Sequence, residues 1–230
     1  MKAMILAAGR GERLRPFTLN TPKPLLRVGN AALIDHALNA IKKAGITDVV
    51  INVHYLGDQI IQHCGDGSRY GLCIVYSIEK ILLDTGGGVY QALPTLGDEP
   101  FLLLSADIWT DFPLQTLLKK SVTDAHLILV ENPEYHVNGD FGLDQNNVIR
   151  CDTLPKYTYA NIGIFHPGLF QRVNIPIFPL RKIILPAIEN SLVTGECYHG
   201  QWHNVGTVEE LEIVKTLSTT TVEYPASPVE

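Results

Sequence analysis

The sequence predicts an α/β fold in which a mostly parallel central sheet is flanked by helices. Short apolar runs alternate with segments of helical periodicity as far as residue 106, which is the pattern of strand–helix–strand units. The run at 101–106 is apolar throughout, as expected for a strand buried on both faces. After residue 124, turn residues rather than helices separate the strands, which predicts a small antiparallel element packed on the same sheet or inserted beside it.

Local patterns support the individual elements in order. The segment 3–8 is a buried strand, and Ile34, Leu38 and Ile41 lie on one face of a helix whose C-cap is Gly45. Asn138-Gly139 and Asn146-Asn147 predict turns. We expect strands at 3–8, 48–53, 72–77, 101–106, 125–131, 148–150 and 159–166, and helices at 32–44, 58–63, 89–93, 181–192 and 208–217.

The chain has the size and composition of one compact domain. Its 230 residues are 46% hydrophobic and 18% charged. We expect a single domain at 1–218, followed by a flexible tail at 219–230, which contains a threonine run and two prolines.

Bulk charge and cysteine usage limit the function classes. A net charge of −6 argues against nucleic acid or an anionic membrane as the main partner. The four cysteines form no C-x-x-C pair, so they predict reduced thiols in the cytoplasm rather than a zinc site or a disulfide scaffold. No run reaches membrane-spanning length, and we expect no membrane association.

A basic loop follows the first strand and is the most informative feature of the sequence. Between positions 10 and 27 five cationic side chains face a single acid, Glu12. The preceding Ala-Ala-Gly allows backbone N–H groups to approach an anion, and prolines on both sides of Lys23 stiffen its segment. Arginine forks and a lysine suit phosphate oxygens, so the loop predicts a polyphosphate site rather than a solvated surface loop. The cations are Arg10, Arg13, Arg15, Lys23 and Arg27.

Two common phosphate loops are excluded. The string from Gly9 to Leu14 begins like a dinucleotide fingerprint but has Leu14 in place of the third glycine. The next strand also ends without an acid, since Asn52 and His54 stand there. A Walker loop requires Gly-Lys-Ser/Thr, which is absent from the sequence.

Asp107 is the candidate metal ligand. It follows the apolar strand at 101–106, where a parallel sheet presents side chains to its ligand crevice. A carboxylate in that position suits Mg²⁺, which prefers oxygen ligands and phosphates. The alternative is a helix N-cap or turn aspartate, and the basic loop favours the metal.

The assembled motifs resemble those of the sugar-1-phosphate nucleotidyltransferases. The resemblance rests on Leu6-Ala7-Ala8-Gly9-x-Gly11-x-Arg13-Leu14-Arg15-Pro16 with Pro22-Lys23-Pro24-Leu25, and extends to about residue 217 through four shorter strings. Within the family, the short length and the string from Leu83 to Gly88 are most similar to N-acetylmuramate-1-phosphate uridylyltransferases of cell-wall recycling, followed by guanylyltransferases acting on mannose or heptose 1-phosphate. The four strings are Gly65-Asp66-Gly67-Ser68, Thr85-Gly86-Gly87-Gly88, Ala106-Asp107 and Trp202-x-Asn204-x-Gly206-Thr207.

The resemblance implies a Rossmann-like nucleotidyltransferase fold, with the antiparallel element on the substrate side, and assigns roles to the candidate residues. The partners would be an NTP and a sugar 1-phosphate, and the chain would be a monomer or weak dimer. Arg15 and Lys23 would contact the triphosphate, and Asp107 and Asn204 would hold Mg²⁺. Leu6, Ala7, Ala8, Gly9, Gly11, Arg13, Thr85 and Gly86 would complete the nucleotide site, and Gly87, Asp140 and Asn161 would contact the sugar.

One position departs from the family pattern and keeps alternatives open. Asn204 stands where the family usually has an aspartate, and a neutral amide should bind Mg²⁺ more weakly in the absence of nucleotide. The related N-acetylglucosamine-1-phosphate uridylyltransferases also have asparagine there. A non-catalytic nucleotide-binding relative, a guanylyltransferase, or a cytidylyltransferase acting on a non-sugar phosphate remain the alternatives.

Overall fold

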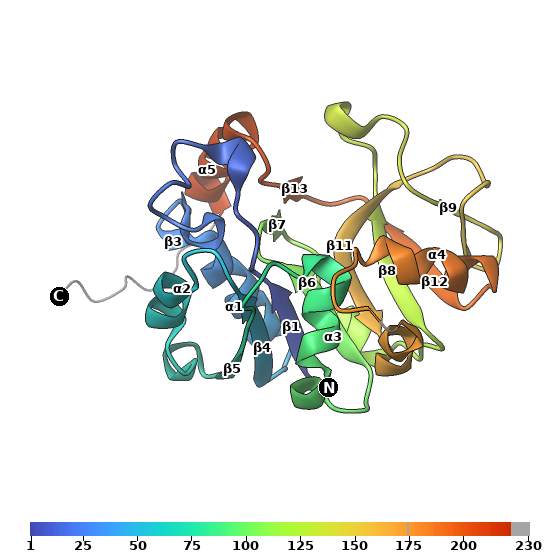
Figure 1. Ribbon diagram of the computed structural model, residues 1–230. Coiled ribbons are helices and arrows are strands. Elements are labelled where there is room, and N and C mark those ends of the chain that lie inside the picture. The colour runs from blue at the N-terminus through green and yellow to red at the C-terminus, as the bar shows by residue number, and fades with distance from the viewer. Residues whose placement is uncertain (174, 222–230) are drawn as a thin grey trace.

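The computed structural model describes residues 1–173 and 175–221, and its centre is a seven-stranded sheet in the order β12-β8-β11-β6-β1-β4-β5 (Figure 1). Only β11 is antiparallel to its neighbours β6 and β8, while the other pairs are parallel. The mostly parallel α/β prediction is therefore confirmed. The strands are β1 (Ala3–Leu6), β4 (Asp48–Val53), β5 (Cys73–Ile78), β6 (Phe101–Ser105), β8 (Ala125–Val130), β11 (Thr158–Phe165) and β12 (Val193–Tyr198).

Helices cover both faces of the sheet. Alternate residues of β1 face opposite cores: Ala3 and Ile5 lie in the core under α1 (Leu33–Lys43) and α2 (Gly57–Cys64), and Met4 lies in the other. That second core is covered by α3 (Asp84–Leu96) and α4 (Arg181–Glu189). In Figure 1, α3 crosses the front of the sheet and α1 lies behind it.

The antiparallel element is part of the main sheet. β11 lies between β6 and β8, so the later strands extend the parallel half rather than form a separate insertion. The expected strand at 148–150 is only β10 (Ile149–Arg150), which pairs with β9 (Gly142–Leu143) across a turn where Asn147 has φ +59°. The edge strand β12 was not predicted, because polar residues and a glycine interrupt its apolar pattern.

Two smaller ribbons and a last helix complete the fold. β2 (Arg27–Val28) pairs with β3 (Ala31–Ala32), and β7 (Ile108–Thr110) pairs with β13 (Trp202–Asn204). The helix α5 (Val208–Thr221) covers a third, smaller core and extends beyond the expected boundary at 218; the rest of the expected tail, 222–230, lies outside the described residues. Within the described part of the chain, no helix is both long and apolar enough to cross a membrane.

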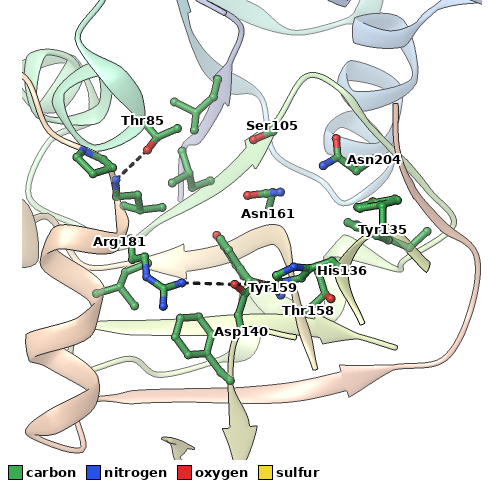
Figure 2. Close-up of a pocket in the computed structure, with 17 residues that line it drawn as sticks. Thr85, Ser105, Tyr135, His136, Asp140, Thr158, Tyr159, Asn161, Arg181 and Asn204 are labelled. Atoms are coloured by element: carbon green, nitrogen blue, oxygen red, sulfur yellow. Dashed lines mark hydrogen bonds and ion pairs between the residues drawn. The ribbon is translucent and has the colours of Figure 1, made fainter. Parts of the chain in front are cut away.

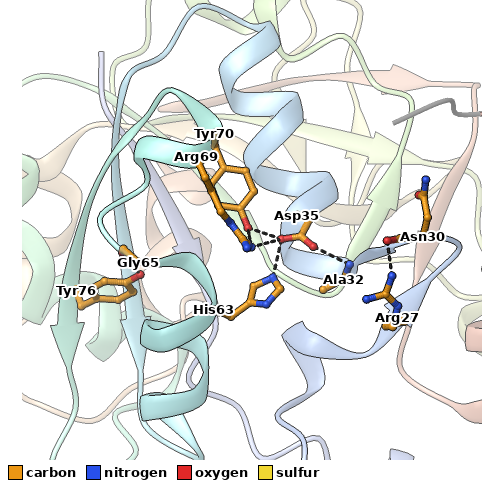
Figure 3. Close-up of polar contacts among 9 residues, drawn as sticks. All are labelled: Arg27, Asn30, Ala32, Asp35, His63, Gly65, Arg69, Tyr70 and Tyr76. Carbon is orange, nitrogen blue, oxygen red and sulfur yellow. Dashed lines mark hydrogen bonds and ion pairs between the residues drawn. The ribbon is translucent and has the colours of Figure 1, made fainter. Parts of the chain in front are cut away.

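A polar cluster fastens α1 to the segment that follows α2 (Figure 3). The Asp35 carboxylate, whose side chain is 14% exposed, accepts hydrogen bonds from the Ala32 N–H, from His63, from Arg69 and from the Tyr70 hydroxyl. Burial alone would raise the pKa of Asp35, but these hydrogen bonds outweigh it and lower the pKa to about 2.

Candidate functional site

Two adjoining cavities open at the carboxyl ends of the parallel strands. The large cavity has a volume of about 520 Å³ and the small cavity about 370 Å³. Both are lined by Leu6 at the end of β1, Ser105 at the end of β6, and Thr85 on α3. This is the edge of the sheet where open α/β folds bind ligands.

A chain of buried hydrogen bonds forms one wall of the large cavity. The Ala7 N–H donates to Asn52 Oδ1 at 2.9 Å, and Asn52 Nδ2 donates to Glu79 Oε1 at 2.7 Å. The second carboxylate oxygen of Glu79 accepts from the Leu83 N–H at 3.0 Å. Asn52 and Glu79 are each 3% exposed, so these groups are rigidly held acceptors and donors. The predicted residues Leu6, Ala7, Ala8 and Gly9 line the same cavity.

The structure brings Lys23 and Asp107 together on the wall of the large cavity. Lys23 Nζ lies 2.5 Å from Asp107 Oδ2, and the two side chains are 12% and 28% exposed. Lys23 is the first residue of a short 3₁₀ turn (Lys23–Leu25), with Pro22 directly before it and Pro24 directly after it. The prolines restrict the backbone on both sides of Lys23, so a stiff segment holds the ammonium near the end of the strand.

The remaining predicted residues of the basic loop line neither cavity and contact either the loop or Gly206. Arg15 is about half exposed, its Nη2 lies 3.6 Å from Glu12 Oε1, and it lines neither cavity. Arg13 packs on Gly206, where an added Cβ would lie 3.0 Å from the guanidinium. Gly11 has φ +63°, and an added Cβ would lie 2.9 Å from Thr18, so glycine is required there to fold the loop back on itself.

Backbone pairing places Asn204 beside Asp107. β13 runs antiparallel to β7 with Asn204 opposite Ile108, and the Val205 N–H donates to the Asp107 carbonyl oxygen at 3.0 Å. The side-chain Oδ1 of Asn204 is buried and has no hydrogen-bond partner among the described residues. A buried amide oxygen without a partner is costly, so this oxygen is a candidate ligand atom.

These two oxygen donors fit a hard cation. No group of three or more His, Cys, Asp or Glu side chains within the described residues would hold a metal ion alone. Mg²⁺, however, is commonly held by one or two protein oxygens together with substrate phosphates and water. Asp107 lines the large cavity and Asn204 the small one, so the pair lies where the two cavities meet.

The expected helix start at residue 89 is wrong, because α3 begins at Asp84 and contains the three glycines. The N–H groups of Gly86 and Gly87 both donate to the Phe178 carbonyl oxygen at 3.0 Å. An added Cβ would lie 2.4 Å from the Phe178 ring at Gly86 and 2.3 Å from the Pro176 carbonyl oxygen at Gly87. The missing side chains therefore accommodate the protein's own segment 176–178. Gly86 and Gly87 line neither cavity, whereas Thr85 lines both.

The small cavity contains the two remaining predicted residues, Asp140 and Asn161 (Figure 2). Asp140 Oδ2 accepts from the Tyr159 N–H at 2.9 Å, while its Oδ1 lies 3.3 Å from His136 Nε2 and 3.5 Å from Arg181 Nη1. Asn161 has φ +56° at an irregularity in the β8–β11 register.

Several polar residues of these cavities were not predicted from the sequence, among them Asn52, Glu79, His136 and Arg181. Asn52 and Glu79 lie at or after the ends of parallel strands, and the strand-end rule that identified Asp107 would have found both. His136 and Arg181 come from a turn and from the start of α4, and no local pattern distinguishes them.

Comparison with known proteins identifies the family of this chain. Residues 2–219 match the Nucleotidyl transferase family (NTP_transferase). The chain is 40% identical over 227 residues to the N-acetylmuramate alpha-1-phosphate uridylyltransferase of Neisseria meningitidis, covering 95% of this chain and 98% of that protein. It is 31% identical to the mannose-1-phosphate guanyltransferase beta-A of Xenopus laevis, covering 90% of this chain and 61% of that protein.

Solved structures support the fold. A Bacillus anthracis protein described as a candidate glucose-1-phosphate thymidylyltransferase superposes with a TM-score of 0.85 at 21% identity, covering 98% of both chains. HddC of Yersinia pseudotuberculosis gives 0.81 at 16% identity, covering 94% of this chain and 99% of that one. The family match spans almost the whole sequence and includes both cavities, and this chain therefore belongs to the sugar-1-phosphate branch of the nucleotidyl transferase family.

Proposed function

We propose that the chain transfers a uridylyl group from UTP to N-acetylmuramate 1-phosphate, giving UDP-N-acetylmuramate and pyrophosphate. The observation that carries the proposal is the Lys23–Asp107 pair beside the unpartnered Asn204 oxygen, at the junction of two cavities. The large cavity would bind the nucleotide and the small cavity the sugar. The choice of substrates rests on the Neisseria relative, of which this chain matches 98% of the length.

The chemistry requires positioning and charge neutralisation rather than a protein nucleophile. An anionic oxygen of the sugar phosphate attacks the α-phosphorus of the nucleotide in line, a new P–O bond forms, and the bond to the β-phosphate breaks. The electron pair leaves with pyrophosphate. The ammonium of Lys23 lies on the wall of the large cavity, where it would stabilise the developing charge. We further propose that Arg15 contacts the triphosphate, which requires its exposed side chain to leave Glu12.

Asp107 and Asn204 would hold Mg²⁺ through their side-chain oxygens. The bound ion would neutralise charge on both reactants and help to align them. In the structure, the ammonium of Lys23 neutralises the charge of the Asp107 carboxylate. UTP as donor and the reuse of N-acetylmuramate favour the cytoplasm, and we propose a monomer or weak dimer.

One observation favours a second candidate, a GTP-dependent enzyme for mannose or heptose 1-phosphate. Glu79 presents a buried carboxylate to the large cavity, and a carboxylate accepts hydrogen bonds but donates none. Guanine offers two adjacent donors, N1–H and the 2-amino group, whereas uracil offers one N3–H between two carbonyl oxygens. The more distant mannose-1-phosphate relatives, which this chain matches over 61% of their length, are named for this reaction.

A substrate panel tests both candidates. Pyrophosphate release is measured with UTP, GTP, dTTP and CTP, each combined with the 1-phosphates of N-acetylmuramate, N-acetylglucosamine, mannose and heptose and with phosphocholine. The first proposal requires the highest kcat/KM for UTP with N-acetylmuramate 1-phosphate. A preference for GTP with mannose or heptose phosphate would establish the second candidate instead.

Two variants distinguish catalysis from simple binding. Asp107→Ala should lose turnover by about 10²–10³-fold, whereas Asp66→Ala removes an exposed carboxylate that lines neither cavity and should retain the wild-type rate. Nucleotide binding without pyrophosphate release in any combination would identify a non-catalytic relative.

A further inference from the structure

Arg181 is the one lysine or arginine among the described residues that line the small cavity. It is the first residue of α4, and its guanidinium lies 5.8 Å from the centre of the Phe141 ring. Its Nη1 lies 3.5 Å from Asp140 Oδ1, a long contact, and its side chain is 59% exposed. Most of its five N–H donors therefore remain available to a ligand.

Neighbouring groups hold this cation without neutralising it completely. The Tyr159 N–H fixes the Asp140 carboxylate on the strand side, and His136 Nε2 lies 3.3 Å from the same oxygen that faces Arg181. Asp140 thus interacts with three groups, and the Arg181 guanidinium lies over the Phe141 ring. These contacts orient the Arg181 side chain and leave hydrogen-bond donors of the guanidinium available to a ligand.

Arg181 lies across the small cavity from Asn204, as Figure 2 shows. In the proposed function the phosphate of the sugar substrate lies near Asp107 and Asn204. Substituents on the part of the pyranose ring remote from the anomeric carbon would then point toward Arg181. N-acetylmuramate carries a carboxylate in that region, on the lactyl ether at O3, whereas N-acetylglucosamine has only a hydroxyl there.

We propose that Arg181 binds the lactyl carboxylate of N-acetylmuramate 1-phosphate and thereby favours this substrate over sugar phosphates that lack the carboxylate. The inference rests on the proposed function and adds the residue that determines sugar selectivity. A guanidinium fork matches a carboxylate in two parallel hydrogen bonds, and a charge-assisted contact of this kind contributes about 10–100-fold in affinity. Asp140 acts as a positioning residue for Arg181.

The test compares three substrates with UTP: N-acetylmuramate 1-phosphate, its lactyl methyl ester, and N-acetylglucosamine 1-phosphate. The wild-type protein should prefer the free acid over the ester by about 10–100-fold in kcat/KM, mainly through KM. In Arg181→Met this preference should fall to about 1–3-fold, and Arg181→Lys should be intermediate because lysine keeps the charge without the fork.

Lys182→Met is the matched control. It removes the next charge along α4 from an exposed position that lines neither cavity, and it should retain the wild-type preference. Turnover of the ester by Arg181→Met reports whether that variant is folded. If Arg181→Met keeps the preference for the free acid, the inference about Arg181 is overturned while the proposed function stands. If the wild-type protein does not use N-acetylmuramate 1-phosphate, the proposed function fails, and the inference fails with it before any variant is measured.

Discussion

Replacing Lys23 with methionine should have opposite effects on catalysis and on metal binding. The ammonium touches Asp107 Oδ2 at 2.5 Å and lines the large cavity. If it also stabilises charge in the transition state, its loss should lower kcat by about 10²–10³-fold. The same substitution frees the Asp107 carboxylate, so Mg²⁺ no longer competes with a lysine.

The size of the gain in metal affinity follows from the exposure of the pair. A charge-assisted hydrogen bond contributes about 1.5–3 kcal/mol when it is well buried. Asp107 is 28% exposed, and solvent compensates for part of that contact, so we expect the lower end of the range. Mg²⁺ should therefore bind about tenfold more tightly to Lys23→Met in the absence of nucleotide.

Two assays measure these effects. Steady-state pyrophosphate release gives kcat, and isothermal titration of the nucleotide-free protein gives the Mg²⁺ affinity. Lys80→Met is the control, because Lys80 is exposed and lines neither cavity. A Lys23→Met protein with near-wild-type kcat, or with weaker Mg²⁺ binding, would refute the assignment of both roles to this side chain.

Four further outcomes are expected. Asn204→Asp adds a charge beside Asp107 and should tighten Mg²⁺ binding to the nucleotide-free protein about tenfold, measured by titration. Glu79→Gln replaces an acceptor by a donor–acceptor pair and should raise the ratio of kcat/KM for UTP over GTP about tenfold; an unchanged ratio would show that the carboxylate does not contact the base. Gly86→Ala should lower the free energy of unfolding by about 2 kcal/mol in urea, because overpacking against Phe178 costs about 3 kcal/mol and alanine regains about 1 kcal/mol of helix propensity. The folded-state pKa of Asp35, about 2, lies below the ordinary value of 3.8, so the stability that this group contributes is present above pH 4 and is lost as the pH falls toward 2. The Asp35→Asn protein should lack about 2 kcal/mol of this pH-dependent stability in denaturant titrations at different pH values.

The sequence predicts the parallel half of the sheet well because each strand there is mostly apolar. The prediction fails where tertiary packing decides the local structure. The three glycines of α3 have low intrinsic helix propensity, and a loop was expected at 85–88. Gly86 and Gly87 lie against segment 176–178, and Gly88 lies against the Asn52 and Glu79 side chains, at distances that exclude a Cβ. Nothing near residue 86 in the sequence encodes these contacts.

Local sequence patterns also predict only part of the candidate site. Lys23 and Asp107 were identified from local patterns, namely a proline-bracketed lysine and an aspartate that follows a buried strand. Arg15 was predicted by the same reasoning; its half-exposed side chain lies 3.6 Å from Glu12, and its contact with the triphosphate stays a prediction. Net positive charge predicts that a loop binds phosphate, but it does not specify which of its side chains face the ligand, because side-chain direction depends on how the loop closes around Gly11 and Thr18.

In the proposed function, the groups that hold the metal and the groups that select the base and the sugar are positioned in different ways. Asp107 and Asn204 are joined through backbone pairing of β7 and β13, which is insensitive to changes in the cavity walls. Glu79 and Arg181 come from the segment after β5 and from the start of α4, on opposite sides of that centre. If Glu79 contacts the base and Arg181 the sugar, as proposed, a substitution at either position should alter which base or sugar fits and leave the backbone pairing near Asp107 and Asn204 in place. Structures that share this fold at only 16–21% identity are consistent with a conserved framework that tolerates wide change around it.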